Sequence, residues 1–204
     1  MAVADSGGRA GGLGQLRIIG GQWRSRRLQI AASTQLRPTP DRVRETLFNW
    51  LQPWIVGANC LDLFAGSGAL GLEALSRGAA GAVLVEHDPA VISVLRANVT
   101  VLGASTADVI MADCVAYLQT QARPFDIVFL DPPYRSGLLG RCCTLLAAGG
   151  WIRPGGLVYL EAPGTQLPEL PEGWLLERSK RAGQVGYHLA RNGPWRSLPR
   201  SAAQ

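Results

Sequence analysis

Residues 60–71 read Cys-Leu-Asp-Leu-Phe-Ala-Gly-Ser-Gly-Ala-Leu-Gly, and this stretch decides the fold. The run from Cys60 to Phe64 is apolar except for Asp62, which predicts a buried strand. Gly66-Ser67-Gly68 ends that strand, because glycine accepts backbone turns that other residues resist. Residues 70–76 then predict a helix. The stretch is therefore a strand, a glycine turn and a helix in direct succession.

Strands and helices keep alternating along the rest of the chain. Further strands are predicted at 82–85, 109–112, 127–130 and 157–160, with helices at 88–102 and 138–148. This alternation predicts an α/β fold with a mostly parallel sheet and helices on both faces. Residues 175–181 and 185–190 predict a terminal hairpin that adds an antiparallel strand near one edge.

Four of the predicted strands end at or near an acidic residue. These residues are Asp62, Glu86, Asp113 and Asp131. Right-handed crossovers bring the carboxyl ends of parallel strands to one edge of the sheet, where open α/β sheets bind their ligands. We therefore expect the four side chains to converge at a ligand site.

Gly66, Gly68 and Gly71 match the pattern G-x-G-x-x-G. A nicotinamide-dependent oxidoreductase uses this turn to hold pyrophosphate at a helix N-terminus, and that is one alternative. Asp62, just before the turn, would repel pyrophosphate but attract an ammonium group. The combination favours S-adenosylmethionine, whose amino-acid end carries that group.

Each acid has an expected part in binding S-adenosylmethionine. Asp62 would hold the amino-acid end, Glu86 both ribose hydroxyls, and Asp113 the adenine amine near the backbone of Cys114. A structural alternative stays open for each: a turn cap for Asp62, a solvated strand end for Glu86, and a helix N-cap for Asp113.

Asp131-Pro132-Pro133-Tyr134 follows a buried strand. Two prolines restrict the backbone, so the Asp131 side chain and the Pro132 carbonyl can accept hydrogen bonds at one point. An exocyclic amine has two hydrogens to donate, and holding both would direct its lone pair toward the sulfonium methyl. Tyr134 could stack on a flipped-out base. The alternative is a rigid loop with Tyr134 as packing.

Basic residues are concentrated before the glycine turn. The net charge is +5 and the sequence pI is about 9.4, which favours a polyanionic partner. Residues 17–30 predict a short hairpin around Gly20-Gly21, and Thr39 and Pro40 are expected as N-cap and first residue of the next helix. The early arginines are Arg17, Arg24, Arg26, Arg27, Arg37, Arg42 and Arg44. They predict a nucleic-acid contact, with a solvated charged face as the alternative.

The sequence predicts neither a membrane protein nor a metalloprotein. Apolar runs fall short of the ~20 residues that span a bilayer, and residues 1–16 are typical of a flexible tail. Cys60, Cys114, Cys142 and Cys143 form no C-x-x-C pair and lie far from the two histidines, so no zinc site is expected. Reduced thiols without a secretion signal predict a cytoplasmic protein.

Several segments together resemble a known family. The runs L-D-L-F-A-G-S-G-A-L-G (61–71), V-E-H-D (85–88) and F-L-D-P-P-Y (129–134) look like class I methyltransferases that act on amines. Residues 17–28, 37–51 and 180–189 narrow the match. They resemble the bacterial 16S rRNA guanine-N2 methyltransferase family, of the small-subunit methyltransferase D type. The resemblance runs from about residue 17 to 190.

The resemblance implies a seven-stranded sheet with one antiparallel strand and S-adenosylmethionine as methyl donor. The substrate would be a guanine of 16S rRNA in assembled or assembling small subunits, and we expect a monomer. Catalysis would fall to Asp131, Pro132, Pro133 and Tyr134. Cofactor contacts are expected at Arg37, Thr39, Asp62, Phe64, Gly66, Gly68, Glu86, His87, Asp113 and Cys114. RNA contacts are expected at Arg17, Arg24, Arg26, Arg27, Arg42, Arg44 and Lys180.

The expected layout is a flexible tail (1–16), a basic arm and helix (17–52), a methyltransferase domain (53–191) and a second tail (192–204). A DNA or protein amino-methyltransferase with the same D-P-P-Y site remains an alternative. The basic arm favours nucleic acid over protein, and no separate target-recognition domain is visible. A catalytically silent RNA-binding protein is a further alternative.

Overall fold

The core of the protein is a seven-stranded sheet, seen here in a computed structural model that describes residues 14–31, 39–133, 136–164 and 167–193. The strand order is β5-β4-β3-β6-β7-β9-β8. The strands are β3 (Asn59–Asp62), β4 (Gly81–Glu86), β5 (Ala107–Met111), β6 (Phe125–Leu130), β7 (Ile152–Pro163), β8 (Trp174–Ala182) and β9 (Val185–Asn192). Only β9 runs antiparallel to its neighbours, β7 and β8. The expected sheet with one antiparallel strand is confirmed.

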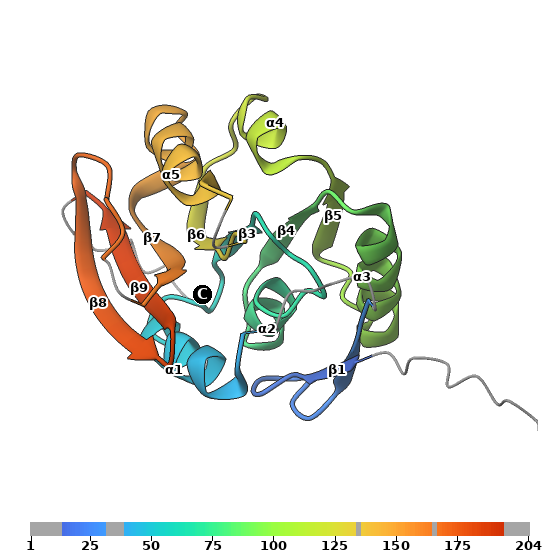
Figure 1. Cartoon of the computed structure of the whole chain (residues 1–204). Coiled ribbons are helices and arrows are strands. Elements are labelled where there is room, and N and C mark those ends of the chain that lie inside the picture. Colours follow the sequence, from blue (N-terminus) through green and yellow to red (C-terminus); the bar gives the residue numbers. More distant parts are fainter. Residues whose placement is uncertain (1–13, 32–38, 134–135, 165–166, 194–204) are drawn as a thin grey trace, which may run out of the picture.

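Helices cover both faces of this sheet (Figure 1). They are α1 (Asp41–Leu51), α2 (Gly71–Ser76), α3 (Pro89–Leu102), α4 (Cys114–Leu118) and α5 (Leu138–Ala148). Cys60 and Phe129 pack with α1, α2 and α3, whereas Leu61 and Leu130 pack with α4 and α5. Successive strand residues point to opposite faces, so a strand covered on both faces is a continuous apolar run. That explains the composition of residues 60–64.

The N-terminal arm forms the expected hairpin, β1 (Gly14–Arg17) paired antiparallel with β2 (Arg27–Ile30). The expected tail boundary is wrong, because residues 14–16 belong to β1. Its apolar side chains Leu16, Ile18 and Leu28 are buried in the core cluster that contains α1, α2 and α3. The arm is therefore part of the folded domain, although the two strands do not join the large sheet.

The start of α1 differs from the expectation. Pro40 occupies the N-cap position and the helix begins at Asp41, so the assignment of Thr39 as N-cap is wrong. The Thr39 hydroxyl lies against two carboxyl groups instead of capping the helix backbone. Among the described residues, none of the helices has both the length and the apolar character needed to cross a membrane.

Candidate active site

The carboxyl edge of the parallel strands brings the acids together. Asp62 is the last residue of β3, Glu86 is the last of β4, and Asp131 directly follows β6. β3 lies between β4 and β6 in the sheet. The charge of Glu86 raises the pKa of Asp62, and the charge of Asp62 raises the pKa of Asp131, so the three carboxyls are electrostatic neighbours. The predicted convergence is found for these three acids.

The glycine turn lies directly against this edge. Gly66 and Gly68 have φ values of +51° and +88°, in the left-handed region that favours glycine. A Cβ on Gly68 would lie 2.5 Å from Leu72 Cδ1, and one on Gly71 would lie 2.1 Å from Leu84 Cδ2. The turn therefore needs glycine both for its dihedral angles and for its close packing.

Asp62 is almost completely buried, at 2% exposure. Its Oδ2 accepts the backbone N–H of Gly71, the first residue of α2, at 3.0 Å. The capping alternative is thus realised, and the backbone N–H of Phe64 also hydrogen-bonds this carboxyl. Burial is the main reason that the pKa of Asp62 rises to about 7, because the charged form of a carboxyl is costly in an apolar interior.

Glu86 holds the turn from the neighbouring strand. Its Oε2 accepts the N–H of Gly66 at 3.0 Å, and its Oε1 accepts the N–H groups of His87 and Asp88 at 2.8 and 3.0 Å. Its side chain is buried, so the solvated strand end is not what the structure shows. The His87 ring lies 3.0 Å from Glu86 Oε1 and is mostly exposed.

Asp113 is the N-cap of α4. Its Oδ1 accepts the N–H groups of Val115 and Ala116 at 2.9 and 3.0 Å. The capping alternative is therefore confirmed for Oδ1, and Oδ2 is the oxygen that could accept a hydrogen bond from an adenine amine. Cys114 is buried beside it, with its Sγ 3.9 Å from that of Cys142. The cysteines that the structure describes are all free thiols.

The Asp131-Pro132-Pro133 segment leaves β6 at the centre of the edge. Asp131 Oδ2 and Glu161 Oε1 lie within hydrogen-bond distance of the Thr39 hydroxyl oxygen, at 3.1 and 3.0 Å. Burial and the charge of Glu161 raise the pKa of Asp131 well above its usual value. Arg37 and Tyr134, expected at this site, lie outside the described residues.

Glu161 was missed by the sequence analysis. It is 3% exposed, lies near the end of β7, and accepts the Tyr159 hydroxyl at 2.8 Å. The signal that identified the other acids was present here too, since Glu161 directly follows the apolar run expected at 157–160.

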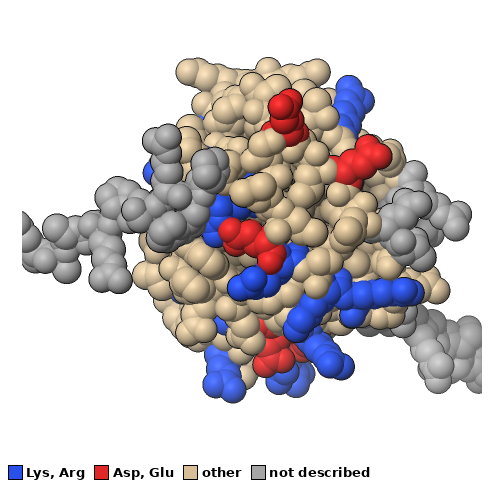
Figure 2. Space-filling view, turned by 90° about the vertical axis from the view of Figure 1, so that its left-hand side faces the viewer, with Lys and Arg blue, Asp and Glu red and all other residues tan. Residues whose placement is uncertain are grey.

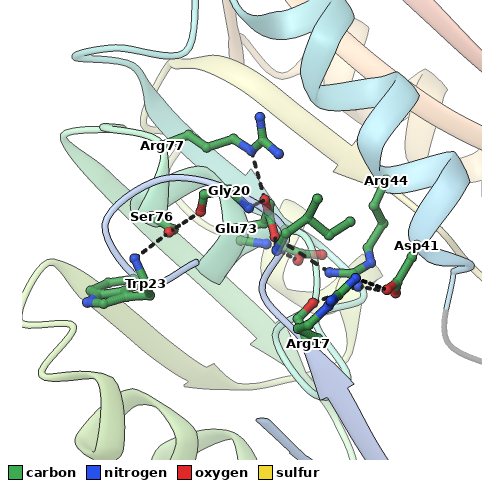
Figure 3. Close-up of polar contacts among 11 residues, drawn as sticks. Arg17, Gly20, Trp23, Asp41, Arg44, Glu73, Ser76 and Arg77 are labelled. Carbon is green, nitrogen blue, oxygen red and sulfur yellow. Dashed lines mark hydrogen bonds and ion pairs between the residues drawn. The ribbon is translucent and has the colours of Figure 1, made fainter. Parts of the chain in front are cut away.

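One expected RNA contact is wrong. Arg44 is fully buried and packs with the apolar face of α1, so it cannot reach a nucleic acid. Its Nη2 donates to Asp41 at 2.7 Å and to the carbonyl of Arg17 at 2.8 Å, and its Nη1 is 3.6 Å from Glu73 Oε2 (Figure 3). Arg44 is an internal ion-pair partner that joins the arm to α2.

The same Glu73 anchors the arm backbone (Figure 3). Its carboxylate accepts the N–H groups of Ile19 and Gly20, both at 2.8 Å, and pairs with Arg77 at 2.7 Å. Beside it, the turn at Gly20-Gly21 approaches the end of α2 so closely that a Cβ on Gly21 would lie 1.7 Å from the Ser76 carbonyl oxygen. The arm is thereby fixed to the helix that follows the glycine turn.

The other expected RNA contacts are on the surface. Arg24, Arg26, Arg27, Arg42 and Lys180 are exposed, and so is Arg17, which lies 3.5 Å from Asp41. On the side that carries β8 and β9, Lys and Arg side chains gather in the lower half of the view (Figure 2). These positions are available to a polyanion.

A cavity of about 320 Å³ lies elsewhere, at the amino edge of the sheet. Its lining includes Asn59, Ala82 and Arg123, and it contains none of the expected site residues. We place the candidate site at the carboxyl edge, because the acids and the glycine turn are there.

Comparison with known proteins gives concordant matches. The family model described as conserved hypothetical protein 95 matches residues 16–191. "Ribosomal RNA small subunit methyltransferase D" of Escherichia coli (strain K12) is 54% identical over 179 residues, which cover 87% of this chain and 90% of the relative. The solved "Putative methyltransferase yhhF from Escherichia coli" is 52% identical with a TM-score of 0.82, covering 89% of this chain and all of the other.

A more distant structure is similar in fold alone. It is the T. thermophilus 16S rRNA N2 G1207 methyltransferase in complex with AdoMet and guanosine, at 22% identity and a TM-score of 0.64. The match covers 88% of this chain and 50% of that one.

Proposed function

The chain belongs to the ribosomal RNA small subunit methyltransferase D family, and we propose that it transfers a methyl group from S-adenosylmethionine to the exocyclic N2 amine of a guanine in 16S rRNA. It is an S-adenosylmethionine-dependent methyltransferase of class I fold. The oxidoreductase alternative is thereby set aside. The observation that carries the proposal is the position of Asp131, at the strand end next to the one that bears Asp62.

The described residues fit this cofactor. Asp62 is a buried carboxyl whose charged form needs a cation, and the ammonium of an amino acid would supply one. At Gly66 an added Cβ would meet only the Phe64 carbonyl oxygen, 4.0 Å away, so this part of the turn has room for a ligand close to its backbone. Glu86 and Asp113 lie at the ends of the next two strands, where they would hold the ribose and the adenine.

S-adenosylmethionine supplies an electrophilic methyl group on a sulfonium. The Asp131 carboxyl and the Pro132 carbonyl would accept the two hydrogens of the guanine amine, and this would turn the nitrogen lone pair toward the methyl group. Such catalysis works by orientation and by fixed dipoles, because a neutral aromatic amine is a weak nucleophile. Tyr134 would stack on the base after it is flipped out of the RNA.

The substrate is proposed to be the assembled or assembling small subunit, which would place the reaction in the cytoplasm. Support comes from the exposed arginines of the arm, which could neutralise backbone phosphates. The Asn98 side chain donates to the carbonyls of Gln29 in the arm and Ser67 in the glycine turn, both at 3.0 Å, so RNA bound to the arm would lie near the reacting centre.

The deciding experiment is tritiated methyl transfer to small subunits that lack the modification, followed by digestion and separation of nucleosides. Label in N2-methylguanosine is expected. Label in methyladenosine or in ribosomal protein, or transfer to DNA alone, would contradict the proposed substrate. A parallel reaction with protein-free 16S rRNA tells whether the assembled particle is required.

A further inference from the structure

A single hydroxyl lies between two carboxyl groups at the reacting edge. Thr39 Oγ1 is 3.1 Å from Asp131 Oδ2 and 3.0 Å from Glu161 Oε1. Thr39 immediately precedes the N-cap of α1, whereas the two acids come from the ends of β6 and β7. Three separate elements therefore bring these groups within hydrogen-bond distance of one another.

One hydroxyl proton cannot serve two ionised carboxylates. A threonine hydroxyl donates one hydrogen bond and otherwise accepts. Both contacts are satisfied when one carboxyl is protonated and donates to Oγ1, while Oγ1 donates to the other. The arrangement thus holds one shared proton between Asp131 and Glu161.

The surroundings decide which acid is neutral. Glu161 Oε1 accepts hydrogen bonds from two hydroxyls, those of Tyr159 and Thr39, and these stabilise its ionised form. Asp131 faces the charges of Glu161 and Asp62, and its pKa is raised well above the usual value by burial and by those charges. The neutral acid is therefore Asp131 and the charged one is Glu161.

We propose that Glu161 is the final proton acceptor of methyl transfer, reached from Asp131 through the hydroxyl of Thr39. This assignment rests on the proposed function. As the C–S bond breaks and the N–C bond forms, the amine proton passes to Asp131 Oδ1. The proton on Oδ2 moves to Thr39 Oγ1, and the Thr39 proton moves to Glu161 Oε1. The positive charge of the sulfonium and the negative charge of Glu161 disappear together, so atoms and charge balance.

The main test is Glu161→Gln in single-turnover methyl transfer to unmodified small subunits, measured from pH 5.5 to 9. We expect the rate constant to fall about a hundredfold, within the usual range for losing a general base. The wild-type rate should rise with pH until the Asp131–Glu161 pair holds only its one shared proton, and this rise should be lost in the variant. Affinity for S-adenosylhomocysteine and KM for the subunit should change less than about twofold, because Gln keeps the volume and an acceptor oxygen.

Tyr159→Phe is the matched control at the acceptor. It removes one hydroxyl donor but keeps the carboxylate, so the rise of rate should move to higher pH while the plateau stays near the wild-type level. The same loss of slope in Tyr159→Phe as in Glu161→Gln would mean that the network acts only through packing, and would overturn the proposal.

Thr39 provides an independent pair of variants. Thr39→Val removes the relay at nearly equal volume and should lower the rate constant at least tenfold, whereas Thr39→Ser should restore most of it. Equal rates for the Val and Ser variants, or a wild-type pH profile in Glu161→Gln, would refute the relay while methyl transfer itself persisted. If the wild type labels no subunit RNA, the proposed function fails instead.

Discussion

The carboxylate of Glu73 accepts the backbone N–H of Gly20 at 2.8 Å, across 53 positions of the chain. This hydrogen bond joins the arginine-bearing arm to α2, the helix that begins at the glycine turn. The arm and the glycine turn are therefore connected through α2, and a substitution at Glu73 should affect both.

Glu73→Gln should lower the free energy of unfolding by about 3–5 kcal/mol, because it removes the buried carboxylate that pairs with Arg44 and Arg77. Urea denaturation measures the change. Glu45→Gln, at an exposed position of α1, is the control and should stay within about 0.5 kcal/mol of the wild type. Equal stabilities of the two variants would show that the anchor is unimportant.

Asp131→Ala should abolish methyl transfer and leave the affinity for S-adenosylhomocysteine within about threefold, since Asp131 is expected to contact the amine and not the cofactor. Calorimetric titration and tritium transfer give the two readings. Asp108→Ala, an exposed residue of β5, should preserve both. Normal turnover by Asp131→Ala would show that Asp131 does not contact the reacting amine.

Cofactor affinity should depend on pH through Asp62. Its pKa in the free protein is raised to about 7, and only its ionised form can pair with an ammonium group. Affinity for S-adenosylhomocysteine should therefore fall as the pH drops below about 7, by up to about tenfold per unit. Calorimetry from pH 5.5 to 8 tests this. Asp62→Asn should bind weakly with a flat profile, and a wild-type slope in that variant would assign the titration to another group.

The raised pKa of Asp62 also makes the stability of the unliganded protein depend on pH, but in the opposite direction to the cofactor affinity. A raised carboxyl pKa means that the folded state binds more protons than the unfolded state between about pH 4 and 7. The Asp62 contribution to the free energy of unfolding is thus largest below this window and declines as the pH rises through it. Urea titrations at pH 5 and 8 should differ less for Asp62→Asn than for the wild type. If the free energy of unfolding differs between pH 5 and pH 8 as much in Asp62→Asn as in the wild type, or more, Asp62 does not cause the pH dependence of stability.

Replacing Arg24, Arg26 and Arg27 by Ala should weaken RNA binding and flatten its salt dependence, by about one unit of slope for each phosphate that the variant no longer neutralises. Filter binding between about 50 and 300 mM salt gives the slope of log affinity against log salt concentration. The control variant changes Arg123, Arg141 and Arg153, which are exposed away from the arm, and should keep the wild-type slope. A wild-type slope in the arm variant would show that these arginines do not neutralise RNA phosphates.

The sheet could be predicted from the sequence because its strands are apolar runs that end in acids. The turn at Gly66-Ser67-Gly68 and the helix expected at 88–102 also followed from local rules, and both are found, the helix as α3 (Pro89–Leu102). Strand ends were less certain, since the strand expected at 157–160 extends to Ile152–Pro163. The extra pairing depends on β6 and β9, which lie far away in the chain.

The burial and ion pairing of Arg44 could not be predicted from local sequence rules. Its spacing to Phe48 and Leu51 puts it on the buried face of α1, but charge alone suggested a surface position. The carboxylate that pairs with it, Glu73, lies in α2, beyond the first strand of the large sheet, and no local pattern connects the two residues. Thr39 was misassigned for the same reason, because its partners Asp131 and Glu161 come from distant strands.

The outermost position of β8 has a consequence for how the molecules behave in concentrated solution. A strand with one unpaired side offers free N–H and C=O groups to any other extended chain, and sheets of separate molecules can fuse in this way. On β8 the exposed Arg178, Lys180 and Arg181 follow one another closely. Two such edges would bring like charges face to face, so repulsion between copies would oppose pairing of one β8 with another.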